Sequence, residues 1–385
     1  MPPTVGCFRC QTAQTTLGRG LLRTMPPMPR RSKWLGPGRI AHGLSWRTQA
    51  LIARLRPPPP PRQLEPTGDL FRKAVLQSFG VTDVAELEPT QRMWAEFTLT
   101  SVERGEEAVG LLGGRARFRG KRVLDVGCAY AGFLVAASAA GAKGAVGIDV
   151  DPKLLELGGL LLADHSVEAT LALADIVDPM MPEDLGQFDI VFCNDVLEHV
   201  EDLGQAASNL ERLLKPRGRL FLEIPNGLSV RYIRSDGHYK LPGITLLDHN
   251  QAREWFRSFY QESYPYRTFF YASLDFYIAL FSRVGISTRL LNAPSSDEQA
   301  IAVLDREWQV SRDRLMDLGS EFPDKPSDLI GAIQQRGREE DQRFLRLHAT
   351  ASGSPSPEER AVAATTLLTT FGLDSYLLEG TKPGT

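Results

Sequence analysis

Cysteine is scarce in this chain. Among its 385 residues are four cysteines in two unlike settings: Cys7 and Cys10 in a basic leader, Cys128 and Cys193 inside apolar runs. Cysteines placed in this way predict no disulfide framework. Cys7 and Cys10 form a C-x-x-C, but no second Cys or His pair follows at the spacing of zinc ligands. We therefore expect no bound metal.

Long apolar runs are also lacking. No stretch approaches the roughly 20 residues that a membrane-spanning helix needs, and the region around Leu154–Leu162 is interrupted by charge and glycine. The composition, 42% hydrophobic and 24% charged, is that of an ordinary soluble protein. We expect a cytoplasmic protein with no membrane partner.

Acidic residues are missing from the first 64 positions, which carry eleven Lys or Arg. The rest of the chain has 33 basic and 47 acidic groups, a net charge of −14. A protein domain with this net charge repels the phosphate backbone of a nucleic acid unless it holds a local basic groove, and the sequence shows no such groove. The charge distribution therefore argues against nucleic acid as a partner.

Residues 1–66 form a leader rich in Arg, Pro and Gly that ends near the proline run Pro57–Pro61. Such a run favours extended polyproline over a packed core, so we expect an unstructured extension. The Arg-rich, acid-free start also suits an organelle transit peptide, although no clean amphipathic helix is evident. Met25 or Met28 could equally be the true start.

The remaining chain divides into three parts by its apolar spacing. Residues 67–116 have helical spacing and predict a helical cap, and residues 306–385 predict a helical C-terminal extension with a Ser/Pro/Gly linker near 349–357. Residues 117–305 alternate strands with helices, which predicts an α/β core with a mostly parallel sheet. An aromatic-rich insertion interrupts this core at 227–270. The predicted strands are Arg122–Val126, Gly144–Asp149, Ala169–Leu173, Phe188–Cys193 and Gly218–Ile224, with Ile286–Leu291 and Ala300–Leu304 closing the sheet.

The strand Arg122–Val126 runs into a turn of small residues, and a helix follows at once. Small side chains let the backbone pass close to a ligand, and the free N–H groups at the start of the helix point toward it. About 22 residues after this turn, the second strand ends in Asp149, a carboxylate that can accept both hydroxyls of a ribose. These features alone predict a nucleotide-binding Rossmann unit.

Further features follow in order along the chain. The third strand leads into Asp175 and Ile176, the fourth ends in Asn194 before a Leu-Glu-His, and Pro216-Arg217-Gly218 precedes the fifth. In these motifs, over about Lys121–Asn226 and more weakly to Leu304, the sequence resembles the class I S-adenosylmethionine-dependent methyltransferases, particularly their small-molecule branch. The resemblance implies a Rossmann-like core with a seven-stranded sheet.

The resemblance also implies the cofactor and its site. S-adenosylmethionine is the expected cofactor, with the first turn facing its methionine part, Asp149 its ribose and the end of the third strand its adenine. The chain departs from the family pattern at Ala129 and Ala131, where glycine is usual. Alanine keeps the close approach if its backbone angles are ordinary, so we expect the cofactor to bind. The predicted cofactor-binding residues are Asp125, Gly127, Cys128, Ala129, Gly132, Asp149, Val150, Asp175, Ile176 and Asn194.

The acceptor side is less defined. Methyl transfer from a sulfonium chiefly requires alignment and exclusion of water, but a base helps when the acceptor is a hydroxyl. The catalytic candidates are His199, His238 and His249, because imidazole titrates near neutrality. Glu198 and His199 could instead cap and orient the loop after the fourth strand. The insertion around His238 could fold over the acceptor, or its aromatics could form ordinary core.

We therefore predict methyl transfer to a small-molecule or glycan acceptor, at oxygen. A nicotinamide-dependent oxidoreductase shares the turn and the acidic second strand but usually shows an uninterrupted G-x-G-x-x-G. A non-catalytic partner subunit with the same fold is the third alternative. The sequence does not determine the acceptor or the oligomeric state.

Overall fold

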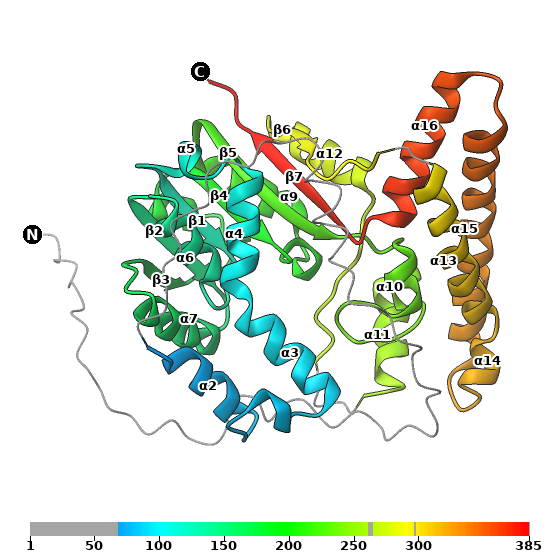
Figure 1. Cartoon of the computed structure of the whole chain (residues 1–385), viewed down its shortest axis with the longest axis horizontal. Coiled ribbons are helices and arrows are strands. Elements are labelled where there is room, and N and C mark those ends of the chain that lie inside the picture. The colour runs from blue at the N-terminus through cyan, green and yellow to red at the C-terminus, as the bar shows by residue number, and fades with distance from the viewer. Residues whose placement is uncertain (1–67, 261–264, 296–297, 385) are drawn as a thin grey trace, which may run out of the picture.

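The computed structural model describes residues 68–260, 265–295 and 298–384 (Figure 1). The predicted leader, residues 1–66, lies outside the described residues. The described chain forms a twisted sheet with helices on both faces, and a group of long helices packs beside it. None of the helices in the described ranges is long and apolar enough to span a bilayer.

A single seven-stranded sheet forms the core, in the order β3-β2-β1-β4-β5-β7-β6. The first five strands run parallel, and β7 is antiparallel to both β5 and β6. This confirms the predicted α/β class with a mostly parallel seven-stranded sheet. The strands are β1 (Arg122–Val126), β2 (Gly144–Asp149), β3 (Thr170–Leu173), β4 (Phe188–Asn194), β5 (Leu214–Pro225), β6 (Ser287–Leu290) and β7 (Ser375–Thr381).

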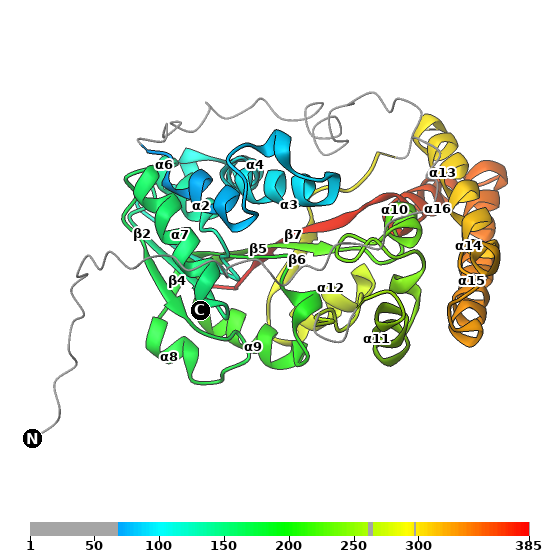
Figure 2. The same ribbon diagram turned by 90° about the horizontal axis from the view of Figure 1, so that it is seen from below.

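The central strands are apolar on both faces, so each face must be covered. Val123 of β1 packs on one side with helices α4 (Ser101–Leu111), α5 (Arg115–Phe118) and α6 (Gly132–Ala139). Its neighbour Leu124 faces the other side, which α8 (Met181–Leu185), α9 (Leu203–Leu213) and α12 (Leu274–Arg283) cover. Figure 2 shows these two helical layers above and below the sheet.

Helices precede β1, within the residues for which a helical cap was predicted. They are α2 (Leu70–Ser78), the short 3₁₀ turn η1 (Val84–Glu86) and α3 (Pro89–Leu99), followed by α4. Phe71 and Val75 of α2 are buried against α7 (Pro152–Asp164), and the Asp164 carboxylate accepts the backbone N–H groups of Leu70 and Phe71 at 3.0 and 2.9 Å. The cap is therefore tied to the sheet through a helix of the core.

Two predictions for the C-terminal third are wrong. Ala300–Leu304 is not a strand but part of helix α13 (Glu298–Met316). The strand that completes the sheet is β7, within residues predicted to be a helical extension, and it lies between β5 and β6. The Leu-rich run at 376–378 is buried between two strands, an environment that its local sequence does not reveal.

The C-terminal helices are thus inserted between β6 and β7. They are α13, α14 (Leu318–Glu321), α15 (Ser327–Gly353), α16 (Pro357–Leu367) and the π-helical turn η4 (Leu368–Gly372). Helix α15 runs through much of the linker predicted at 349–357. Figure 1 shows these helices as an upright group at one end of the sheet.

The 227–270 insertion shares a core with these C-terminal helices. It contains α10 (Val230–Arg234), the 3₁₀ turn η3 (Ile244–Leu246) and α11 (His249–Arg257). Trp255 and Phe256 of α11 are buried in the same cluster as Trp308 of α13 and Phe344 of α15. Most of the insertion's aromatics are therefore core, as one of the two interpretations predicted.

Candidate functional site

The turn after β1 has the backbone of a tight ligand-facing loop. Gly127 has φ +67°, and a Cβ built there would lie 2.4 Å from Cγ2 of Val196, in the loop after β4. Only glycine adopts this conformation without steric cost, and only glycine leaves room for Val196. The turn after β1 and the loop after β4 are therefore in direct contact at the carboxyl edge of the sheet.

The two alanines of the turn do not have the ordinary backbone angles that we expected. Ala129 has φ +42° and Ala131 φ +62°, both in the left-handed region. An L-residue pays roughly 1–2 kcal/mol for this conformation. The turn therefore has left-handed backbone angles that glycine would adopt without strain and that the two alanines adopt at a cost in energy.

Asp149 ties the ends of β1 and β2 together. One carboxylate oxygen accepts the backbone N–H of Ala129 at 2.9 Å, and the other accepts that of Asp151 at the same distance. Asp125, inside β1, is buried, and one of its carboxylate oxygens has no hydrogen-bond partner. Burial, and then the negative charge of Asp149, raises the pKa of Asp125 well above its usual value.

The other predicted cofactor residues separate into two groups. Val150 is 65% exposed, and Leu173 at the end of β3 is 63% exposed, so two apolar side chains stand open at the same edge. Asn194 at the end of β4 accepts the N–H of Glu223 at 2.9 Å, while its buried amide nitrogen has no partner. Ile176 instead faces the hydrophobic core at 4% exposure.

Asp175, Gly132 and Cys128 each have a local structural role. Asp175 is exposed and accepts the backbone N–H of Val177 at 3.1 Å. A Cβ at Gly132 would lie 2.4 Å from the backbone of Ser101, so glycine lets α6 approach α4. Burial raises the pKa of the Cys128 thiol, which keeps it neutral. The close packing of α6 on α4 is enough to explain why position 132 is glycine, so this residue gives no evidence for a ligand.

This edge of the sheet fits an adenosine-bearing ligand. Helix α6 begins at the turn with no side chain capping its free N–H groups. Asp149 presents a carboxylate, and the exposed Val150 and Leu173 offer apolar surface for a flat base. The unpartnered polar atoms of Asp125 and Asn194 lie in the next two strands of the sheet, β1 and β4. A nucleoside with a charged tail would use each of these features.

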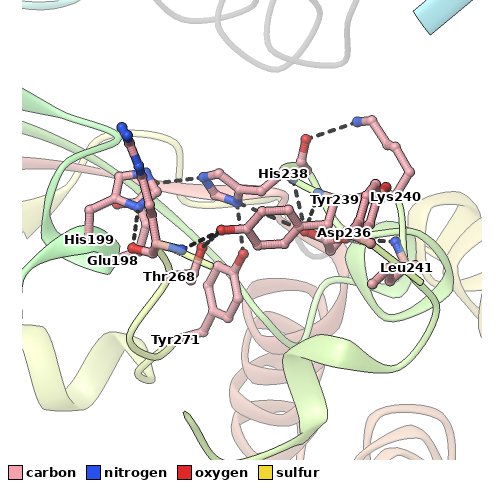
Figure 3. A network of polar contacts seen from close by, with 12 residues as sticks. Glu198, His199, Asp236, His238, Tyr239, Lys240, Leu241, Thr268 and Tyr271 are labelled. Carbon is pink, nitrogen blue, oxygen red and sulfur yellow. Dashed lines mark hydrogen bonds and ion pairs between the residues drawn. The ribbon is translucent and has the colours of Figure 1, made fainter. Parts of the chain in front are cut away.

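A second group of polar side chains lies just beyond β4. The 3₁₀ turn η2 (Leu197–His199) carries Glu198 and His199, and His238 of the insertion meets them (Figure 3). Oε1 of Glu198 is 3.6 Å from Nε2 of His238 and 3.8 Å from Nε2 of His199. We call these three residues the Glu198 cluster. The structure thus brings together two of the three predicted histidines.

Backbone groups hold the Glu198 cluster in place. The carbonyl of Arg267 lies 3.0 Å from Nδ1 of His199, and the carbonyl of Glu198 accepts the N–H of Phe269 at 2.8 Å. His238 is fixed from its other side, because its Nδ1 is 2.9 Å from the Tyr271 hydroxyl. The Nε2 atoms of both histidines are therefore left to face the carboxylate.

Buried Asp236 shapes the loop that presents His238. Its carboxylate accepts the backbone N–H groups of His238 and Tyr239, both at 2.9 Å, and that of Leu241 at 2.8 Å (Figure 3). A carboxylate that accepts several backbone N–H bonds rigidifies a turn. The sequence Arg234–Tyr239 therefore forms a defined loop that faces the cluster.

Burial within the cluster changes its electrostatics. Desolvation lowers the pKa of His199, the Glu198 carboxylate opposes this, and neighbouring His238 adds to it. Glu198 is fully buried, yet neither of its carboxylate oxygens accepts a hydrogen bond. From the sequence, Glu198 was expected to orient the loop after β4 rather than to take part in catalysis. The Leu-Glu-His pattern was the available signal, but burial without a donor is visible only in three dimensions.

His249 lies outside the Glu198 cluster. Its Nδ1 is 3.2 Å from the carbonyls of both Thr268 and Phe269, and its ring stacks on Phe269 at a centroid distance of 5.1 Å. The same segment, residues 267–269, holds Glu198 and His199 through its backbone. His249 thus contacts the support of the cluster.

A cavity of about 200 Å³ opens beside the cluster, at the carboxyl end of β5. Tyr271 lines it and also bonds His238, so it joins the cavity to the cluster. Arg336 and Glu340 of α15 also line it. Burial raises the pKa of Glu340. The cavity is therefore polar and large enough for a small ring or headgroup.

The core of the chain matches a known type of domain. Residues 104–288 match the family model described as a methyltransferase domain. The match covers the turn after β1, the ends of β2 to β4 and the Glu198 cluster.

Curated relatives match over a shorter stretch. The chain is 37% identical over 115 residues to a ubiquinone biosynthesis O-methyltransferase of Pseudomonas aeruginosa, covering 29% of this chain and 47% of the relative. It is 37% identical over 122 residues to the protein of that name from Thiobacillus denitrificans, covering 31% and 50%. The chain therefore spans about half the length of these relatives.

Among solved structures, the YcgJ protein from Bacillus subtilis is 17% identical, with a TM-score of 0.39 over 72% of this chain and 99% of that one. The family match and the strand order agree on the core. Residues 104–288 of the chain therefore match a methyltransferase domain, and the observed sheet agrees with the predicted Rossmann-like methyltransferase core.

Proposed function

We propose that the chain transfers a methyl group from S-adenosylmethionine to a hydroxyl oxygen of a small-molecule acceptor. The observation that carries this proposal is the contact between the turn after β1 and the loop after β4, through Gly127 and Val196. It brings the expected cofactor residues beside a loop that bears Glu198 and His199. The matched relatives named as O-methyltransferases support oxygen as the acceptor atom.

In this proposal, the bound cofactor supplies an electrophilic methyl group. Asp149 accepts hydrogen bonds from the ribose hydroxyls while it holds Ala129, and the N–H groups at the start of α6 face the ligand. Val150 and Asp175 border the base. These roles orient a reactant and exclude water, which is most of what an in-line displacement requires.

The acceptor is assigned to the cavity at the end of β5 and to the Glu198 cluster. Nε2 of His199 and of His238 are the ring nitrogens that neither the backbone nor Tyr271 occupies, so they can receive the acceptor hydroxyl. We assign His249 to positioning the 267–269 segment. The net charge of −14 outside the leader favours a small molecule over nucleic acid as acceptor. A cytoplasmic location stays a prediction.

Calorimetric titration with S-adenosylhomocysteine and with NAD tests the cofactor assignment. We expect S-adenosylhomocysteine to bind and NAD not to bind. Asp149→Ala should weaken binding by about 10–100-fold, because hydrogen bonds to a charged group contribute about 1.5–3 kcal/mol. Asp189→Asn is the matched control: Asp189 pairs with Lys215 at the opposite edge of the same sheet. Preferential binding of NAD would contradict the proposal.

Methyl transfer itself is tested with labelled S-adenosylmethionine and the small-molecule fraction of a cell extract. At limiting cofactor, labelled product should form with the wild-type chain and much more slowly with Asp149→Ala. Analogue binding without transfer to any extract component would instead favour the non-catalytic partner subunit.

A further inference from the structure

The Glu198 cluster has the composition of a metal site. One carboxylate and two imidazoles converge, and their nearest donor atoms all lie within 4.8 Å of one another. A glutamate with two histidines is a ligand set that binds catalytic zinc and related divalent transition ions. We propose that Glu198, His199 and His238 bind one divalent transition cation, with zinc as the reference ion. This departs from the expectation of no metal, which considered only Cys7 and Cys10.

The first argument is the state of Glu198. Its side chain is 0% exposed, and neither carboxylate oxygen accepts a hydrogen bond. Burying a charged group without compensation is costly, and buried charges are ordinarily paired or coordinate metals. The two imidazoles are its neighbours, but at 3.6 and 3.8 Å they are beyond hydrogen-bond distance. A cation between them would satisfy all three.

The second argument is distance. Donor atoms that bind zinc tetrahedrally at about 2.0–2.1 Å lie about 3.4 Å from one another. The carboxylate-to-imidazole separations of 3.6 and 3.8 Å are close to this value. A direct hydrogen bond would have drawn these atoms below 3.2 Å. All three donor atoms lie within 4.8 Å of one another, so the side chains must move closer together to close the site around an ion.

The third argument is the support of the ligands. Histidines that bind metals use one ring nitrogen as ligand and give the other a partner that fixes the ring. In His199, Nδ1 lies 3.0 Å from the Arg267 carbonyl, and in His238, Nδ1 lies 2.9 Å from the Tyr271 hydroxyl. Both Nε2 atoms then face Glu198 (Figure 3).

Three protein ligands leave a coordination position open, as in catalytic rather than structural zinc sites. With an ion bound, this open position, and no longer the two Nε2 atoms, would take the hydroxyl oxygen of the acceptor. A hydroxyl bound to a cation loses its proton more readily, because the ion stabilises the anion. This role rests on the proposed function, whereas the binding site does not. The occupant expected beside the ion is thus a phenol or another hydroxylated small molecule.

The test is calorimetric titration of chelator-treated full-length protein with zinc alone, without cofactor or acceptor. A C7S/C10S variant is titrated in parallel, so that the leader cysteines cannot account for the binding. We expect one ion per chain in both proteins. Glu198→Gln and His238→Ala should each weaken binding about 100-fold or more, because even partners outside the ligand set change metal affinity about 10–100-fold. Far-ultraviolet circular dichroism checks that each variant is folded.

His348→Ala is the control, since His348 lies on α15, outside the cluster and its supporting segment, where its ring stacks on Phe344. It should bind zinc like the wild type. His199→Gln, at a more exposed ligand, provides a third variant should His238→Ala fail to fold. The absence of stoichiometric binding in C7S/C10S, or zinc affinity unchanged by Glu198→Gln, would overturn the site.

S-adenosylhomocysteine is titrated into the same metal-free protein. Analogue binding without zinc binding would overturn the metal site alone. Zinc binding without methyl transfer would support the site and count against the proposed function.

Discussion

Replacing Gly127 by alanine should destabilise the folded protein by about 2 kcal/mol. The residue has φ +67°, where an L-side chain costs roughly 1–2 kcal/mol. The added Cβ would also lie 2.4 Å from Cγ2 of Val196, which must leave its rotamer at about 0.5–1.5 kcal/mol. Lower entropy of the unfolded chain offsets about 0.5 kcal/mol of this.

Urea unfolding followed by circular dichroism measures this effect, provided that the slope of the transition is unchanged. Binding of S-adenosylhomocysteine is measured by calorimetry on the same variant, because a displaced turn should also weaken cofactor binding. We expect a lower urea midpoint and weaker binding in the same variant.

Two further variants separate the causes. In the double variant with Val196→Ala, the clash disappears but the backbone strain remains, so the two changes should couple by about 1 kcal/mol. Ala129→Gly relieves a left-handed residue at φ +42° in the same turn, and its stability should stay within about 0.5 kcal/mol of the wild type or rise. A Gly127→Ala protein with wild-type stability would refute the reasoning. So would a double variant with no coupling.

Two predictions concern the strand that the sequence did not reveal. Burial raises the pKa of Glu379 in β7, but hydrogen bonds from Arg289 and Arg219 outweigh this and lower it below its usual 4.5. The stabilisation is therefore present above about pH 4.5 and is lost as the pH falls through the lowered pKa. Glu379→Gln should lower the free energy of unfolding by about 1 kcal/mol at pH 7. Between pH 5 and 3, its urea midpoint should fall less than that of the wild type. An equal fall in the wild type and the variant would count against the ion pairs. Asn226→Ala should cost about 2–3 kcal/mol in thermal or urea unfolding, because the buried amide donates to two carbonyls of the segment entering β7 at 2.8 Å each. A loss below 0.5 kcal/mol would show that water replaces it.

Local pattern was enough to predict the sheet as far as β6. Strands such as Arg122–Val126 and Gly144–Asp149 are short apolar runs bounded by turn residues, and both have the predicted bounds. Parallel strands place their carboxyl ends at one edge, so Asp149 and Asn194 could be predicted on the same side of the sheet from their positions alone.

The predictions that failed depended on distant partners. The run Tyr376-Leu377-Leu378 becomes a strand because it pairs antiparallel with β5 and β6, and nothing in its own spacing specifies those partners. The apolar pattern of Ala300–Leu304 is compatible with a strand and with a buried helix segment. Packing against the other C-terminal helices stabilises the helix.

The sequence by itself therefore determined the turn, the acids and the strand ends of the predicted cofactor site, because these are local features with a fixed order. Tertiary structure alone decided the acceptor half. Glu198 and His238 are 40 positions apart, and they meet only because the insertion packs over the end of β4. Burial of Glu198 without a donor follows from that packing, since exposure and partners are properties of the folded chain rather than of any segment.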